Sequence, residues 1–91
     1  MNSSAAIDEL MGRDVVLDVA SRYVYVGTLA SYDEHHFVLL DTDVHDLRDT
    51  ATTRELYVLD SRRHGIRANR KRVVVRRSEV VSFSALDDVV E

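Results

Sequence analysis

The alternation of apolar and polar positions along the chain predicts a small β protein with five strands. Residues 14–20 alternate between apolar and polar faces, with Val15, Leu17 and Val19 on one of them, which predicts a half-buried strand. Two longer apolar runs flank a polar turn near 33–36 and predict a hairpin. The five predicted strands span residues 14–20, 23–32, 36–43 or 44, 72–76 and 80–84.

The sequence predicts a helix in two places. An apolar stripe of Ile7, Leu10 and Met11, with a serine cap before it and Gly12 after it, predicts a helix at 4–12. A second helix is expected at 53–64, inside an insert at 45–71. The form Thr52-x-x-Glu55 is that of a capping box, Gly65 is placed to end the helix, and Leu56, Leu59 and Arg63 share a face with Tyr57 beside them. The acidic tail at 85–91 carries Leu86, Val89 and Val90, which are expected to dock.

One glycine lies inside a predicted strand. Gly27 follows the apolar run at 23–26, and beyond it only Leu29 and Tyr32 are large. A glycine in the interior of a strand weakens that strand, so it marks a bend, a bulge or a close approach of the backbone. A long strand that changes its facing pattern at a glycine can curl a small sheet into a barrel.

Composition narrows the functional classes. The 91 residues form a single domain, 1–91, and include no cysteine, which excludes disulfides and thiolate metal sites. Apolar runs are too short for a membrane span, and no export signal is visible, so we expect a cytoplasmic protein. We see no activated nucleophile and no phosphate-binding loop, so we predict that the protein is not an enzyme and uses no cofactor.

The net charge of −4 is unevenly distributed. Residues 54–77 contain nine of the twelve basic residues and only two acids, whereas the remainder holds three basic residues and fourteen acids. Such a chain can present one basic surface to a polyanion. The alternative is a solvated loop, or arginines that pair with acids of a neighbouring subunit.

Two stretches of the chain resemble the signatures of the Sm-like (LSm/Hfq-type) protein family. The first is Gly27, Leu29 and the pair Tyr32-Asp33, followed by the apolar residues of the next strand. The second is Val73-Val74-Val75-Arg76, then Ser78 and the run 80–83. The resemblance implies a strongly bent five-stranded antiparallel barrel of the Sm-like or SH3-like type, with a helix before it. The helical insert at 45–71 is longer than the loop usual in this family.

The resemblance also implies a function. Sm-like proteins bind single-stranded RNA, without catalysis, in rings of six or seven copies, and serve as RNA chaperones or in RNA processing. We therefore expect single-stranded RNA and a homo-hexamer or heptamer as partners, with no membrane and no small-molecule substrate. In the family's pocket, His35 falls at the stacking position, Asp33 at the orienting aspartate, and Arg76 and Ser78 in the second signature.

Two residues depart from the family's pattern. Phe37 occupies the position of the base-reading asparagine, and Arg77 that of the glycine after the arginine. Phenylalanine cannot hydrogen-bond a uracil edge, whereas Arg77 adds charge that serves affinity and not selectivity. In the basic segment 62–72, Arg67 and Arg70 are candidate phosphate contacts, and Asn69 is a candidate base reader.

Several alternatives remain open. Asp33 can instead cap its own turn, and Phe37 can belong to the core. The chain can be a scaffold or protein-interaction ring that has lost the RNA pocket, or a Tudor-like barrel with an aromatic cage of Tyr23, Tyr25 and Tyr32. Asp41, Asp43 and His45 would share one face of an extended strand, but such spacing arises easily by chance, so no metal site is predicted.

Overall fold

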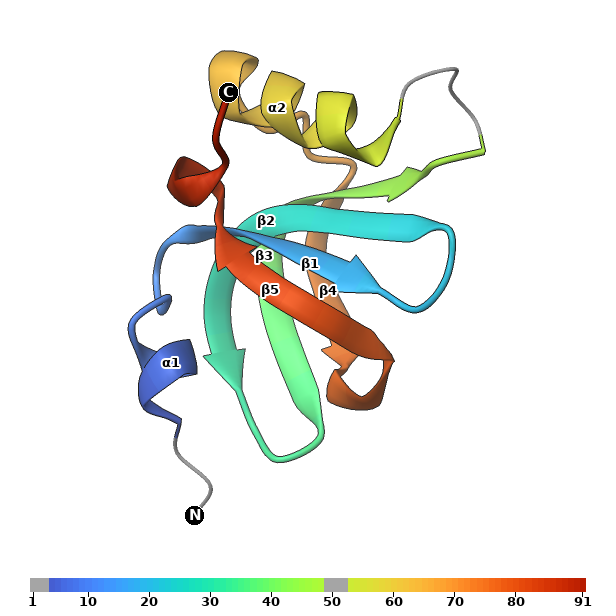
Figure 1. The fold of residues 1–91 in the computed structure, drawn as a ribbon. Helices are drawn as coiled ribbons and strands as arrows, with labels where there is room; N and C mark the ends of the chain where they lie inside the picture. The colour runs from blue at the N-terminus through green and yellow to red at the C-terminus, as the bar shows by residue number, and fades with distance from the viewer. Residues whose placement is uncertain (1–3, 49–52) are drawn as a thin grey trace.

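The five strands form one antiparallel sheet that curls strongly (Figure 1). The computed structural model describes residues 4–48 and 53–91. The strands stand in the order β4-β3-β2-β1-β5, and the short η1 joins the two edge strands. In chain order the elements are α1 (Ala5–Asp8), β1 (Asp14–Val19), β2 (Tyr23–Tyr32), β3 (His36–Asp46), α2 (Arg54–His64), β4 (Arg70–Arg76), η1 (Arg77–Glu79), β5 (Val80–Ala85) and η2 (Leu86–Asp88). The predicted fold class is confirmed, including both helices and their places in the chain.

The insert is shorter than predicted because the strands on both sides of it are longer. β3 continues to Asp46, where it still pairs with β2, and β4 already begins at Arg70, opposite Thr42. The helix α1 is also shorter than the predicted 4–12, since it is a single turn. Its cap is Ser4, whose side chain accepts a hydrogen bond from the N–H of Ile7, and turns follow it up to Gly12, at φ +77°.

Gly27 marks a sharp distortion of the sheet, as its position in the sequence predicts. The pairing of β2 with β3 slips by one residue between Val26 and Thr28. Opposite Gly27, β3 therefore has two residues, Asp41 and Thr42, and Asp41 adopts φ +46°. A Cβ atom on Gly27 would lie 2.3 Å from Oγ1 of the buried Thr42. Only a residue without a side chain allows β2 and β3 to approach so closely here.

The strand β1 is buried on both faces and not half-buried, as its alternation had predicted. Val15 and Leu17 belong to the main core, between the curled sheet and α1, whereas Val16 belongs to a second core. The second core also contains Val58 of α2 and Leu86 of η2. The prediction was wrong because α2 and the tail cover the outer face of β1, which a strand pattern alone cannot reveal.

The helix α2 packs through another face than the predicted one. Val58 and Ser61 are buried, whereas Leu56 is 55 % exposed. The small side chain of Ser61 lets the helix approach the sheet, and the cap is Thr53, whose side chain accepts a hydrogen bond from the N–H of Leu56. Thr52, the first residue of the predicted capping box, lies outside the described residues.

The tail follows α2 along one end of the sheet (Figure 1). Leu86 is buried and Val89 is half-buried against the second core, as predicted, but Val90 is 89 % exposed and does not dock. Glu91 forms ion pairs with Arg62 and Arg63 of α2. Neither helix within residues 4–48 and 53–91 is long and apolar enough to cross a membrane.

Candidate nucleic-acid interface

Two turns that are distant in the sequence meet at one end of the sheet. The β2–β3 turn begins after Tyr32, and η1 follows β4 directly. His36 pairs with Arg76 in the β3–β4 ladder, and the N–H of Arg77 donates to the carbonyl oxygen of His35 at 2.8 Å. Between the turns lies an open hollow of about 650 Å³. Its lining residues are Glu34, His35, His36, Arg76, Arg77 and Ser78.

Asp33 fixes the shape of the β2–β3 turn. One of its carboxylate oxygens accepts hydrogen bonds from the N–H groups of His35, at 2.8 Å, and His36, at 2.7 Å. The same oxygen is 3.2 Å from Nδ1 of His36. The bond from the His35 N–H, together with those from His36, lowers the pKa of Asp33. In the structure Asp33 therefore caps its own turn and shapes the wall of the hollow without lining it.

Arg77 is held in one position at the edge of the hollow. Its Nη1 atom donates to the carbonyl oxygen of Asp33 at 2.7 Å. Its guanidinium lies 5.5 Å from the centre of the Phe37 ring and 5.8 Å from that of Tyr32. A guanidinium held by a hydrogen bond and two aromatic rings is a fixed, flat positive charge.

Phe37 lies in the main core, below Arg77. It is 3 % exposed, and its ring packs against Phe83 at a centroid distance of 5.6 Å. It is not among the lining residues of the hollow, and none of those residues, all within the described chain, carries a side-chain amide. The hollow can therefore hold an anion or a flat ring, but it has no amide with which to read a base edge.

The charge of the hollow is mostly positive. Arg76 is exposed, and no described residue forms a hydrogen bond or ion pair with its side chain. Arg77 adds a second cation, and the rings of His35 and His36 meet edge to face at 6.3 Å. Glu34 is the one acid in the lining. The sequence predicted His35, Arg76, Arg77 and Ser78 for this site, and the structure brings these four together.

Glu34 and His36 were missed as lining residues. The signal for both was present in the predicted turn at 33–36, because residues at the tip of a hairpin project toward whatever lies beside it. What the sequence lacked was the register that places His36 opposite Arg76.

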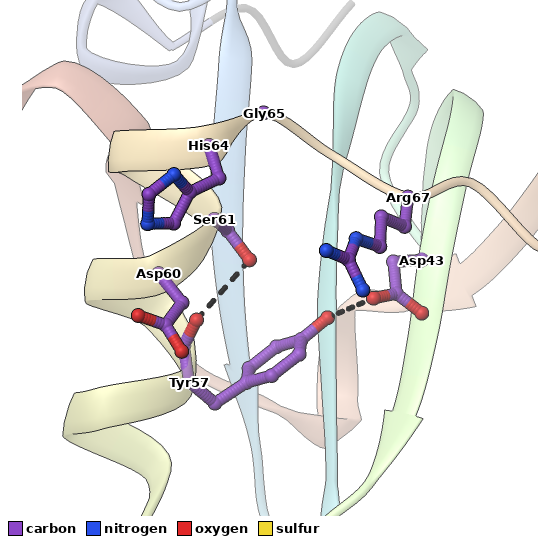
Figure 2. Close-up of a pocket in the computed structure, with 7 residues that line it drawn as sticks. All are labelled: Asp43, Tyr57, Asp60, Ser61, His64, Gly65 and Arg67. Atoms are coloured by element: carbon purple, nitrogen blue, oxygen red, sulfur yellow. Dashed lines mark hydrogen bonds between the residues drawn. The ribbon is translucent and has the colours of Figure 1, made fainter.

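The predicted contacts of the basic segment lie elsewhere. The amide of Asn69 bonds the backbone N–H and C=O of Val44, both at 3.0 Å, and extends the β3–β4 ladder. Arg70 donates to the carbonyl oxygen of Asn69. Arg67 lines a different hollow, between α2 and β3 (Figure 2). That second hollow, with Tyr57 and Asp60 in its lining, was missed altogether.

Two alternative sites are not assembled in the structure. Tyr23 and Tyr32 stand at opposite ends of a ten-residue strand, so they cannot form one aromatic cage. The hydroxyl of Tyr32 bonds Asp8 instead. Asp41 lies in the bulge of β3, which breaks the alternation on which a metal site would depend, and the described residues contain no cluster of three or more metal-ligating side chains.

Comparison with known proteins gives a structural match. No model of a protein family matches the chain, and no curated protein sequence matches it. Among solved structures, the chain is similar to the Sm protein of Pyrococcus abyssii in complex with a uridine heptamer. The similarity has a TM-score of 0.63 and 18 % sequence identity, and it covers 93 % of this chain and 99 % of that one. A match over almost the full length of both chains confirms the resemblance at the level of architecture: the chain has the Sm fold.

Proposed function

We propose that this chain is a non-catalytic, Sm-like protein that binds single-stranded RNA in the hollow between the β2–β3 turn and η1. The observation that carries the proposal is the convergence of His35, Arg76, Arg77 and Ser78 on one open hollow. These residues come from two parts of the sequence, and the sheet register and the Arg77–His35 backbone bond bring them together. The match to an Sm protein in complex with uridine RNA supports the same reading.

The chemistry of the hollow suits a nucleotide. Arg76 forms no ion pair with Glu34 or with any other described residue, so it is available to a phosphate, and the fixed guanidinium of Arg77 offers a second charge. The exposed ring of His35 provides a surface on which a base stacks, and stacking contributes on the order of 1–3 kcal/mol per base. Because Phe37 is buried and no amide lines the hollow, we expect little preference among bases.

We propose further that copies of the chain assemble into a ring of six or seven. The edge strands β4 and β5 each pair with a single neighbour in the sheet and do not pair with each other. Both edges carry exposed apolar residues, since Val74 is 48 % and Val81 is 73 % exposed. Pairing of β4 with β5 of the next copy satisfies both edges. A ring also repeats the hollow, so weak contacts add up along one RNA strand.

The binding proposal is tested by fluorescence anisotropy with short oligo-U and oligo-A at two salt concentrations. We expect both to bind with similar affinity, and more weakly at the higher salt concentration. Arg76→Ala should weaken binding by roughly tenfold, because it removes a direct phosphate contact. Arg13→Ala is the matched control: it removes the same charge from an exposed side chain that does not line the hollow.

Two outcomes would contradict the binding proposal. Equal losses in the Arg76→Ala and Arg13→Ala variants would mean that the net charge binds RNA and the hollow does not. An intact oligomer that binds neither RNA at low salt would favour the scaffold or protein-interaction ring instead.

A further inference from the structure

A second hollow lies between α2, β3 and the connector before β4, and the RNA site does not use it. Figure 1 places α2 and the β2–β3 turn at opposite ends of the sheet. This α2 hollow has a volume of about 170 Å³. Figure 2 shows its lining residues, which are Asp43, Tyr57, Asp60, Ser61, His64, Gly65 and Arg67.

One wall of the α2 hollow is rigid. The hydroxyl of Tyr57 donates to the Asp43 carboxylate, and its ring stacks on His45 at 3.8 Å with an interplanar angle of 7°. Asn69 donates to the other carboxylate oxygen of Asp43 at 3.1 Å. Burial and the Asp43 carboxylate raise the pKa of Tyr57, so the phenol keeps its proton. Tyr57 and Asp43 thus form this rigid, partly aromatic wall.

Three polar side chains around the α2 hollow remain available to a ligand, whereas the hydroxyl of Ser61 donates to the carbonyl oxygen of Tyr57 at 3.2 Å. No described residue forms a hydrogen bond or ion pair with the side chain of Asp60, His64 or Arg67. Asp60 and His64 approach from α2, and Arg67 approaches from the connector on the other side (Figure 2). Both carboxylate oxygens of Asp43 already accept hydrogen bonds, so Asp60 and Arg67 are the unpaired acid and base that line this space. The neighbouring Arg62 and Arg63, in contrast, both pair with Glu91.

We propose that the α2 hollow binds a guanine base. A ligand for this space must donate hydrogen bonds to Asp60 and accept them from Arg67. Guanine alone among the RNA bases has two adjacent donors, N1–H and the 2-amino group, that match one carboxylate. It also has two adjacent acceptors, O6 and N7, that match one guanidinium, and arginine on these atoms is the commonest specific contact to a base. One face of the Tyr57 ring is covered by His45, so the flat base stacks on the opposite face.

The size of the α2 hollow agrees with a single base. About 170 Å³ is the space of five or six water molecules at about 30 Å³ each, and it is smaller than the roughly 300–1,000 Å³ of pockets that enclose drug-sized ligands. The base enters, and the ribose and phosphate remain outside, near the basic segment 62–72. That the guanine belongs to an RNA strand rests on the proposed function, whereas the fit of the base does not.

The test is an NMR titration of the full-length, ¹⁵N-labelled chain with guanosine, inosine and adenosine monophosphates. Guanosine monophosphate should shift the amide signals of residues 57–67 and bind roughly tenfold more tightly than adenosine monophosphate. Inosine monophosphate lacks only the 2-amino group, so its affinity should fall between the two. Asp60→Asn should abolish the preference for guanine. Glu55→Gln, at an exposed position of the same helix outside the α2 hollow, should leave it unchanged.

Each outcome decides the proposal. Equal affinities for the three nucleotides, a preference that survives Asp60→Asn, or the absence of shifts at 57–67 would overturn it. The result is also separable from the RNA proposal, because that one depends on Arg76 and on signals at 33–36 and 76–78. Guanine binding without binding of oligo-U would support the α2 hollow as a guanine site and contradict the RNA site at the β2–β3 turn. Binding of oligo-U without guanine binding would support the RNA site and contradict the guanine site.

Discussion

The backbone N–H of Arg77 donates to the carbonyl oxygen of His35 at 2.8 Å and so ties the β4–β5 turn to the β2–β3 turn. The side chain of Arg77 forms a second hydrogen bond between the two turns, since it donates to the carbonyl oxygen of Asp33. The candidate RNA site therefore has its geometry before any ligand arrives. Pre-formed contacts reduce the entropy that binding would otherwise cost.

Replacing Asp33 with alanine should weaken RNA binding although the side chain does not line the hollow. The variant loses the carboxylate oxygen that holds the N–H groups of His35 and His36. The turn then samples other conformations, and His35 no longer keeps its place beside Arg76 in the lining of the hollow. Anisotropy titrations measure the affinity, and thermal unfolding measures the accompanying loss of stability. Asp33→Asn is the control: its side-chain oxygen still accepts from the turn, so it should lie between the wild type and alanine. If alanine and the wild type bound RNA equally, the positioning role of Asp33 would be refuted.

Gly27→Ala should destabilise the fold by about 1–3 kcal/mol, the usual cost of overpacking a closed site. The new methyl group would lie 2.3 Å from Oγ1 of Thr42 and 3.1 Å from the carbonyl oxygen of Leu40. Urea unfolding of the single variants and of the double variant with Thr42→Ala gives the coupling energy. We expect the two changes to be coupled by about 1 kcal/mol or more, since Thr42→Ala removes the nearest clashing atom. Simple additivity would show that the two residues are not in contact.

The edges of the sheet should control assembly. Val81→Lys places a charge on the exposed face of β5, where we propose that the next copy binds, and it should shift the protein toward monomers. The exposed Leu56 of α2 lies outside both edges, so Leu56→Lys is a control that should leave the assembly intact. Light scattering at micromolar concentration measures the mass. A wild-type protein that is monomeric under these conditions would contradict the ring.

Acid should weaken the end of the β2–β3 hairpin through Asp46. Hydrogen bonds from Arg48, followed by one from Arg22, lower the pKa of Asp46 to about 2 from an ordinary 3.8. A carboxyl whose pKa is lower in the folded state stabilises that state above its ordinary pKa, so this contribution is complete above about pH 4 and disappears as the pH falls toward 2. Acid unfolding curves of the wild type and Asp46→Asn should therefore converge below pH 4. Curves that stay a constant distance apart from pH 7 to 2 would refute the assignment.

The sequence predicted the strands well because their signals are local. The apolar runs of β2 and β3, the polar turn between them and the interior position of Gly27 each reflect the backbone of a few neighbouring residues. Burial by distant elements was not predictable in this way. β1 is buried on both faces only because α2 and η2 reach it, and α2 faces inward through Val58 and Ser61, which no apolar stripe marked.

In the candidate site, too, local sequence signals were predictive and contacts between distant segments were not. Arg76, Ser78 and His35 came from the resemblance to the Sm-like signatures, and the fold brings them together. The turn-capping bonds of Asp33 agree with the alternative reading of that residue. The α2 hollow could not be predicted, because Arg67 reaches it only through the path of the connector after Gly65.

Whether RNA lies in the hollow between the β2–β3 turn and η1 is tested most directly by photocrosslinking the intact oligomer to a short oligo-U that contains 4-thiouridine, followed by mass spectrometry of the peptides. If RNA occupies the hollow, crosslinks fall within residues 33–37 and 76–79, decrease in the Arg76→Ala variant and stay unchanged in the Arg13→Ala variant. Crosslinks found only in the basic segment 62–72, or equal in all three proteins, would place the RNA outside the hollow.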